Sequence, residues 1–119
     1  MRKIYYLLCI LLIAACNGEQ KGSGTVEETT RVPSVYTVNY PLAWMVEEIA
    51  GDLVELDFPA PSGVDPAFWE PDIATVLQYQ QADLVLLNGA NYAAWVAKVS
   101  LPRARTRDTS LGYRDQLIK

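Results

Sequence analysis

The sequence predicts an α/β domain in which a parallel sheet is flanked by helices. Three observations lead to this fold class. Short β-branched or apolar runs alternate with amphipathic segments of helix length, Pro and Gly mark the boundaries between them, and one apolar run is uninterrupted. Strands that alternate with helices favour a parallel sheet, because each parallel connection must cross back over the sheet. We expect these crossovers to be right-handed.

The first half of the domain is predicted to contain a strand, a helix and a second strand. Residues 35–38 are β-branched or aromatic, which favours a strand. Pro41 fits the first turn of a helix, and Gly51 fits its C-terminal cap. Residues 53–58 alternate between apolar and acidic side chains, as a half-buried strand does. The apolar face of the helix is expected to consist of Leu42, Met45, Val46 and Ile49.

A long loop and a second helix are expected next. Residues 59–66 are rich in Pro and Gly, which indicates a loop. The helix is predicted to begin at Pro71 or Asp72, both of which suit a helix N-terminus. Its apolar side is expected to consist of Ile73, Val76 and Leu77.

The remaining residues are predicted to complete the sheet. The unbroken apolar run 84–87 suits a strand that is covered on both faces. Residues 88–89 are Asn-Gly and indicate a turn, after which residues 92–99 are expected to be helical. Residues 106–109 are expected to form a short fourth strand, and residues 113–118 to begin a last helix.

The first 15 residues are predicted to be a lipoprotein signal peptide and not part of the fold. Arg2 and Lys3 precede the apolar run 4–15, which ends in small residues directly before Cys16. This run is about a dozen residues long, whereas a spanning helix needs roughly 20. Residues 13–16 resemble the bacterial lipobox, which implies that the chain is cut before Cys16 and that its thiol carries the lipid.

A tether is expected between the lipid and the folded part. Residues 16–31 consist mostly of Gly, Ser, Thr, Glu and Lys, and such a composition cannot bury enough apolar surface to fold. Cys9 would be removed with the signal peptide, so no disulfide is expected in the exported chain. Residues 32–119 are then the α/β part, which we interpret as an incomplete lobe because it is small for this fold.

The charge balance argues against nucleic-acid binding. The chain has 10 Lys and Arg against 14 Asp and Glu, and removal of the signal peptide would make it more acidic. No aromatic interleaving or nucleic-acid motif accompanies the basic residues near the C-terminus. We interpret this cluster as a solvated face; it comprises Arg103, Arg105, Arg107 and Arg114.

Residues 35–95 resemble the solute-binding proteins of zinc and manganese ABC importers. The segments that carry the resemblance are, in order, Tyr40-Pro41-Leu42-Ala43, Ile49-Ala50-Gly51-Asp52, Gly63-Val64-Asp65-Pro66, Trp69-Glu70-Pro71, Gln81-Ala82-Asp83-Leu84-Val85, Asn88-Gly89-Ala90 and Trp95. The resemblance implies two α/β lobes joined by a rigid helix, with the metal held between them. This chain would supply most of the N-terminal lobe.

The same resemblance implies partners and a location. Zinc or manganese would be the transported ion, and an ABC permease in the membrane would be the protein partner. The protein would lie outside the cytoplasm, in the periplasm or on the cell surface, anchored by its lipid. We expect it to be a monomer.

The candidate metal ligands lie in the loop after the second expected strand. In the family, this loop usually carries a His after Asp65-Pro66 as the first metal ligand, but Ala67 stands there, and the chain has no His. Asp65, Glu70 and Asp72 remain, and carboxylates suit manganese, magnesium or calcium better than zinc. We favour structural roles for all three: a turn, contact with a helix N-terminus and a helix cap respectively.

The favoured function is therefore the substrate-binding subunit of a metal importer, truncated and without tight metal binding of its own. Ala67 has two explanations that stay open: a branch of the family with ligands elsewhere, or a decaying gene. The alternative functions are a membrane-tethered structural or protein-interaction lipoprotein, which uses an uncovered strand edge or apolar face, and a non-functional fragment. An enzyme is not expected, because no His could act as a general base and no Ser has a base at motif spacing.

Overall fold

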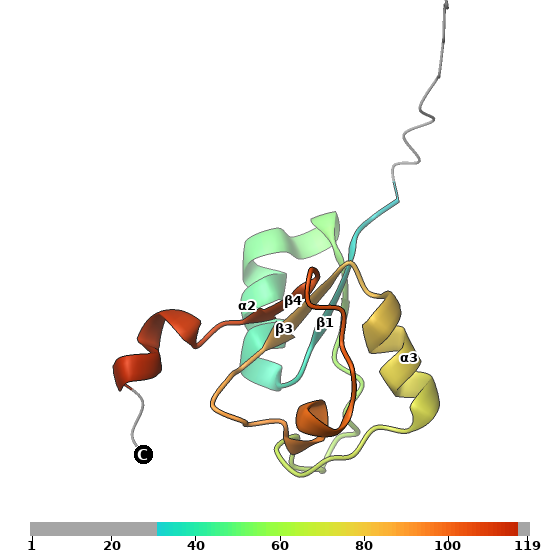
Figure 1. Ribbon diagram of the computed structural model, residues 1–119. Helices are drawn as coiled ribbons and strands as arrows, with labels where there is room; N and C mark the ends of the chain where they lie inside the picture. Colours follow the sequence, from blue (N-terminus) through green and yellow to red (C-terminus); the bar gives the residue numbers. More distant parts are fainter. Residues whose placement is uncertain (1–30, 117–119) are drawn as a thin grey trace, which may run out of the picture.

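The computed structural model describes residues 31–116, and the predicted signal peptide and nearly all of the predicted tether lie outside this range. No helix within the described range is long and apolar enough to cross a membrane. The elements are β1 (Ser34–Thr37), α2 (Tyr40–Ala50), η1 (Gly51–Leu53), β2 (Glu55–Asp57), α3 (Ile73–Gln81), β3 (Leu84–Leu87), η2 (Ala94–Lys98), β4 (Thr106–Asp108) and η3 (Leu111–Gln116), where η marks a 3-10 helix (Figure 1).

The four strands form one parallel sheet in the order β2-β1-β3-β4, which confirms the predicted fold class. Val35 in β1 pairs with Leu56 of β2 on one side and with Leu84 of β3 on the other. After β1, the chain first adds β2 on one side of β1 and then adds β3 on the opposite side. Helices α2 and α3 lie on opposite faces of the sheet, as Figure 1 shows.

Helix α2 has the predicted ends, but it buries fewer side chains than expected. Asn39 caps it, because its Oδ1 accepts a hydrogen bond from the Leu42 N–H at 3.0 Å. Gly51 ends it with a positive φ of 47°, and the 3-10 turn η1 follows. The second strand is therefore shorter than predicted. Of the residues expected on its apolar face, Leu42 is buried, whereas Met45 and Ile49 are exposed, so the sheet covers only part of that face.

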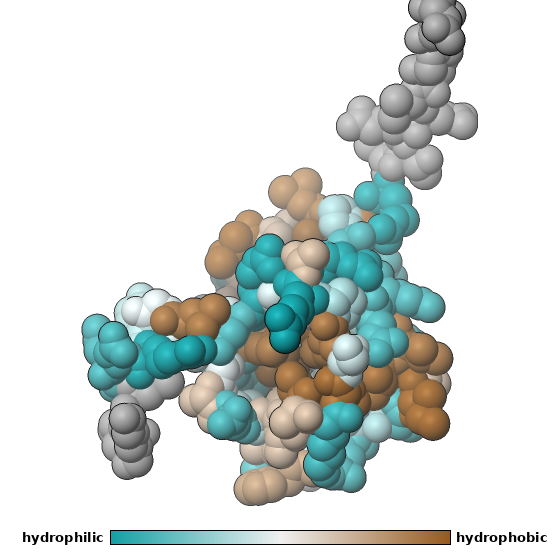
Figure 2. Space-filling model, in the orientation of Figure 1, coloured by the Kyte–Doolittle hydropathy of each residue, from teal (hydrophilic) through white to brown (hydrophobic). Residues whose placement is uncertain are grey.

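Helix α3 also begins where predicted, with a different inner face. Asp72 caps it by accepting a hydrogen bond from the Thr75 N–H at 2.7 Å. Ile73 and Leu77 are exposed, whereas Tyr79 is completely buried. The turn of the helix that places Tyr79 against the sheet directs Ile73 and Leu77 outward. Hydrophobic atoms are accordingly visible on the side where α3 lies (Figure 2).

Tyr79 is the centre of the hydrophobic core. Its ring contacts Tyr36 at a centroid distance of 5.1 Å and Trp95 at 4.9 Å. Its hydroxyl donates a hydrogen bond to the Thr37 carbonyl at 2.8 Å, which joins α3 to the end of β1. Burial raises the pKa of Tyr79, so the phenol stays neutral. Val85, in the middle of β3, is also completely buried in this core.

In the last third of the described chain, strands and helices follow one another in the predicted order, but the helices are of the tighter 3-10 type. Strand β3 has the predicted bounds, but only Val85 is buried and its other residues are half-buried. Strand β4 was predicted one residue longer. The two helices expected around it are the 3-10 helices η2 and η3. Short connectors commonly adopt this tighter form.

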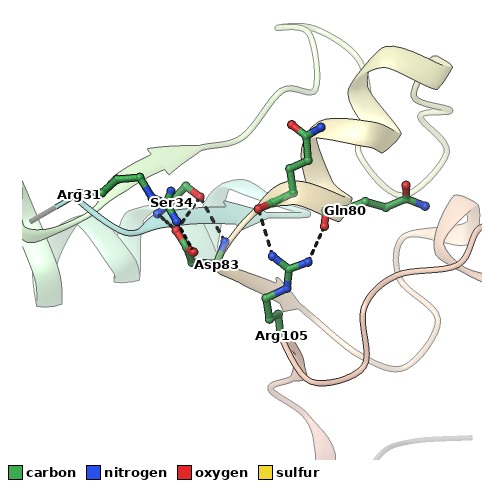
Figure 3. A network of polar contacts seen from close by, with 6 residues as sticks. Arg31, Ser34, Gln80, Asp83 and Arg105 are labelled. Atoms are coloured by element: carbon green, nitrogen blue, oxygen red, sulfur yellow. Dashed lines mark hydrogen bonds and ion pairs between the residues drawn. The ribbon is translucent and has the colours of Figure 1, made fainter. Parts of the chain in front are cut away.

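A polar network joins the amino ends of the strands (Figure 3). The Asp83 carboxylate accepts hydrogen bonds from the Ser34 N–H at 2.8 Å and from Arg31 at 2.6 Å. These donors lower the pKa of Asp83 to about 2, and the Ser34 N–H has the largest effect. Arg105 donates to the carbonyls of Gln80 and Gln81 at the end of α3. Arg105 is thus half-buried and structural, whereas the other three arginines of the basic cluster are exposed, as predicted.

Candidate functional site

The carboxyl ends of the strands form the edge at which parallel sheets bind ligands. The chain leaves β1 toward β2 on one side and reaches β3 on the other, so the connections diverge between β1 and β3. Such a divergence leaves a crevice outside the strand ends, and ligands of open α/β sheets bind there. The segments that reach this edge are residues 38–39, the loop 58–72, residues 88–93 and residues 109–110.

Two asparagines join the strand ends at this point. Asn39, only 3% exposed, donates from Nδ2 to the Oδ1 of Asn88 at 2.8 Å. The Oδ1 of Asn39 is already used to cap α2, so one side chain fixes the start of the helix and the end of β3. Sequence analysis did not identify this pair. Asn39 alone could have been found from the sequence, because an Asn directly before Tyr40-Pro41 stands where a helix cap is expected.

Gly89 makes the next corner of this edge. Its φ is +78°, and a Cβ at this position would collide with the side chains of Asp108 and Ser110. Asp108 Oδ1 in turn accepts hydrogen bonds from both the N–H and the hydroxyl of Ser110, each at 2.8 Å. The chain segments that follow β3 and β4 therefore pass each other closely at this corner.

A pocket of about 550 Å³ lies beside the Gly89 corner. One part of its lining comes from η2 and the segment before it, and contains small apolar residues such as Ala93 and Ala97. The other part is polar and includes Asp108, Ser110 and Arg114. The carboxyl edge therefore combines an apolar wall with a few polar groups, as small-molecule and ion sites commonly do.

Asp65, the first predicted carboxylate, organises the turn that it occupies. Its Oδ1 accepts a hydrogen bond from the Ala67 N–H at 2.9 Å. Its backbone carbonyl accepts from Phe68 at 3.1 Å and from Trp69 at 3.0 Å. A side chain that bonds two residues ahead in this way forms an Asx turn.

Glu70 and Asp72 are each engaged with a different partner. Glu70 forms an ion pair with Lys98 of η2, which lowers the pKa of this exposed carboxylate. The expected contact of Glu70 with a helix N-terminus stays a prediction, and the contact that the structure shows is with Lys98, 28 residues away in the sequence. Asp72 caps α3, and the Thr75 donor lowers its pKa.

Three contacts connect the loop 65–70 to η2, and we call them the loop–η2 contacts. The Ala94 N–H donates to the Ala67 carbonyl at 3.3 Å, and the Trp69 ring lies edge-on to Trp95 at 6.4 Å. The Glu70–Lys98 ion pair is the third contact. They fix residue 67, the position of the expected first ligand, against η2. The neighbouring Phe68 points away and is 82% exposed.

The structure does not gather the three carboxylates into one cluster. Across residues 31–116, no group of three or more His, Cys, Asp or Glu side chains is arranged to hold a metal ion. Each of Asp65, Glu70 and Asp72 instead accepts its own donor within the loop, α3 or η2. The arrangement therefore provides a scaffold for the loop, whose side chain at position 67 is a methyl group.

Comparison with known proteins identifies relatives of this scaffold. Residues 35–112 match the family model described as zinc-uptake complex component A, periplasmic. The high-affinity zinc uptake system protein ZnuA of Bacillus subtilis is 33% identical over 88 residues, which cover 74% of this chain and 27% of that protein. The manganese ABC transporter substrate-binding lipoprotein PsaA of Streptococcus pneumoniae is 33% identical over 108 residues, which cover 83% of this chain and 34% of that protein.

Solved structures agree on the fold. The metal-dependent lipoprotein YcdH of Bacillus subtilis superposes with a TM-score of 0.60 at 27% identity, covering 67% of this chain and 32% of that one. A crystal structure of ZnuA superposes with a TM-score of 0.59 at 24% identity. The chain thus spans about a third or less of the length of the relatives it matches.

The family to which these relatives belong binds solutes for transport and does not catalyse reactions. The family model covers β1 to the start of η3, so it includes the whole sheet and the carboxyl edge. The chain belongs to the ZnuA family, the solute-binding proteins of zinc and manganese ABC transporters.

Proposed function

We propose that this chain is the N-terminal-lobe part of a substrate-binding component that delivers zinc or manganese to an ABC importer. The observation that carries the proposal is the family match over residues 35–112. The pocket at the diverging strand ends supports it, because that edge is where an open parallel sheet presents a ligand site.

We propose further that Ala67 occupies the position of the first metal ligand and removes this ligand from the site. A methyl group has no lone pair to donate, whereas zinc sites are built from imidazole, thiolate and carboxylate groups. The nearby carboxylates already have partners: Asp65 bonds to Ala67 itself, and Glu70 bonds to Lys98. The chain alone is therefore expected to bind zinc and manganese weakly or not at all.

Restoring an imidazole at position 67 tests this assignment. In calorimetric titrations with zinc chloride, Ala67→His should bind at least about tenfold more tightly than the unchanged chain. Phe68→His is the matched control, because it adds the same group at the neighbouring exposed position, which the loop–η2 contacts do not fix. Circular dichroism should show the same fold for all three proteins.

Two outcomes would count against the ligand assignment. An equal gain in Phe68→His would mean that any added imidazole in this loop binds zinc, so position 67 would not be special. Tight one-to-one binding by the unchanged chain would show instead that Asp65, Glu70 and Asp72 form a working site.

We also propose that a lipid on Cys16 anchors the protein to a membrane outside the cytoplasm. The support is the signal-like sequence of residues 1–16 together with the lipoproteins among the relatives. Cys16→Ser should abolish incorporation of labelled palmitate. Undiminished incorporation by this variant would refute the anchor.

A further inference from the structure

The pocket beside Gly89 is lined by two side chains of opposite charge. Asp108 lies at the end of β4, and Arg114 lies on η3, which extends away from the sheet in Figure 1. Neither takes part in an ion pair with another residue of the range 31–116. Asp108 accepts both hydrogen bonds from Ser110 through Oδ1, so its Oδ2 has no hydrogen-bond partner within the same range. One acidic and one basic group are therefore available in the pocket.

A left-handed turn adds backbone donors to the same pocket. Gly89, Ala90 and Asn91 all line it and all have positive φ values, of 78°, 50° and 58°. The Tyr92 N–H closes the turn on the Gly89 carbonyl at 3.0 Å, whereas the N–H groups of residues 89–91 donate to no other residue that the structure describes. Successive N–H groups in such a turn form a concavity that binds anions. Ala90 adopts this conformation at a cost, since its Cβ crowds the next carbonyl oxygen.

The remaining wall of the pocket is apolar. It includes Val38, Leu87, Ala93, Val96 and Ala97. The volume of about 550 Å³ lies within the range of small-molecule sites, in which a few polar groups orient a ligand against an apolar wall. An acid and a base beside an apolar wall suit a small molecule that has both charges and an apolar group.

We propose that this pocket binds an α-amino acid with an apolar side chain. The carboxylate of the ligand accepts hydrogen bonds from Arg114 and from the N–H groups of residues 89–91. The ammonium group of the ligand donates to Oδ2 of Asp108, and the side chain packs against Ala93 and Ala97. An inorganic anion fits less well because Asp108 repels it, and a metal ion fits less well because Arg114 repels it.

The test is calorimetric titration of the full chain with L-leucine and with two analogues that each lack one charge. 4-Methylpentanoate lacks the ammonium group, and 3-methylbutylamine lacks the carboxylate. L-Leucine should bind at one-to-one stoichiometry. Each analogue should bind at least about tenfold more weakly, because one charged hydrogen-bonding group of the pocket is then left without its partner. No metal is present in these titrations, so the inference does not rest on the proposed function.

Variants of the two charged residues assign the two ends of the ligand. Arg114→Gln should weaken L-leucine binding by about tenfold or more without weakening that of 3-methylbutylamine, which has no carboxylate. Asp108→Asn keeps an acceptor for Ser110, and it should weaken L-leucine binding without weakening that of 4-methylpentanoate. Arg103→Gln and Asp115→Asn are the matched controls, because they remove the same charges from exposed positions outside the pocket, and both should bind L-leucine like the unchanged chain.

Three outcomes would overturn the proposal. No detectable binding of L-leucine by the unchanged chain at about 10 mM would exclude the site. Equal affinities of the unchanged chain for L-leucine and 4-methylpentanoate would mean that the pocket takes apolar acids and does not recognise the ammonium group. Equal losses in Arg114→Gln and Arg103→Gln would mean that net charge and not the pocket determines binding. The comparison of L-leucine with its analogues uses only the unchanged chain, so it decides the matter even if a variant fails to fold.

Discussion

The two edges of the sheet differ in how their polar groups are used. At the amino edge, the Asp83 carboxylate is paired with Ser34 and Arg31, and Arg105 occupies the last carbonyls of α3. At the carboxyl edge, the Asn39–Asn88 pair fixes the backbone, and a pocket of about 550 Å³ remains beside it. The hollow near the amino edge is smaller, at about 220 Å³. One edge is closed by its own hydrogen bonds, and the other is held open.

This difference shows that residue type alone does not identify a site. Asp83 lies directly before β3 and Asp65 lies in the loop after β2, and each carboxylate accepts a hydrogen bond from one backbone N–H. Asp83 joins two strands at the closed edge, whereas Asp65 shapes a loop that leads to position 67 at the open edge. The position of a side chain relative to the strand ends therefore indicates its role better than its charge does.

The largest stability effect is expected from Gly89→Ala, at the open edge. The added Cβ would collide with the side chains of Asp108 and Ser110, and the positive φ disfavours any side chain. Together these costs should lower the free energy of unfolding by about 2–4 kcal/mol, measured by urea denaturation with Trp fluorescence.

A double variant separates the two causes of that loss. Ser110→Gly removes the Ser110 atoms that would collide with the added Cβ and leaves the collision with Asp108. Gly89→Ala with Ser110→Gly should therefore recover part of the packing cost and none of the backbone cost. Equal stability of Gly89→Ala and the unchanged chain would mean that the segments after β3 and β4 do not approach each other as closely as described. The pocket wall that they form would then have a different shape.

The order of elements could be predicted because its signals are local. Pro41, Gly51 and Asp72 mark helix ends through their own backbone or side-chain chemistry, and the structure has helix ends at all three. The inner faces of the helices could not be predicted in the same way. Ile49 and Ile73 belong to the apolar sides that the sequence predicts, yet both are exposed, because the packing against the sheet and not the periodicity decides which apolar residues are buried.

The contacts of the candidate site depend on residues far apart in sequence. Asn39 and Asn88 are 49 residues apart, and Glu70 and Lys98 are 28 residues apart. No local pattern specifies such pairs, because they form only when the sheet brings the strand ends together. The cap of Asp72 and the turn of Asp65 span three residues and two residues, so both could be anticipated from the sequence.

The smaller effect is expected at the closed edge, from Asp83→Asn, and it should depend on pH. The pKa of Asp83 is about 2 in the folded chain, below the roughly 3.9 of an unfolded Asp. A depressed folded pKa stabilises the fold above the unfolded pKa, and this contribution is lost as the pH falls toward 2. Asp83→Asn should therefore lower the urea midpoint at pH 7, and the midpoints of this variant and the unchanged chain should converge near pH 2.

Asp115→Asn, which removes the same charge from exposed η3, should have the urea midpoint of the unchanged chain at every pH. A constant offset between Asp83→Asn and the unchanged chain at every pH would mean that the network in Figure 3 acts through packing and not through the carboxylate charge.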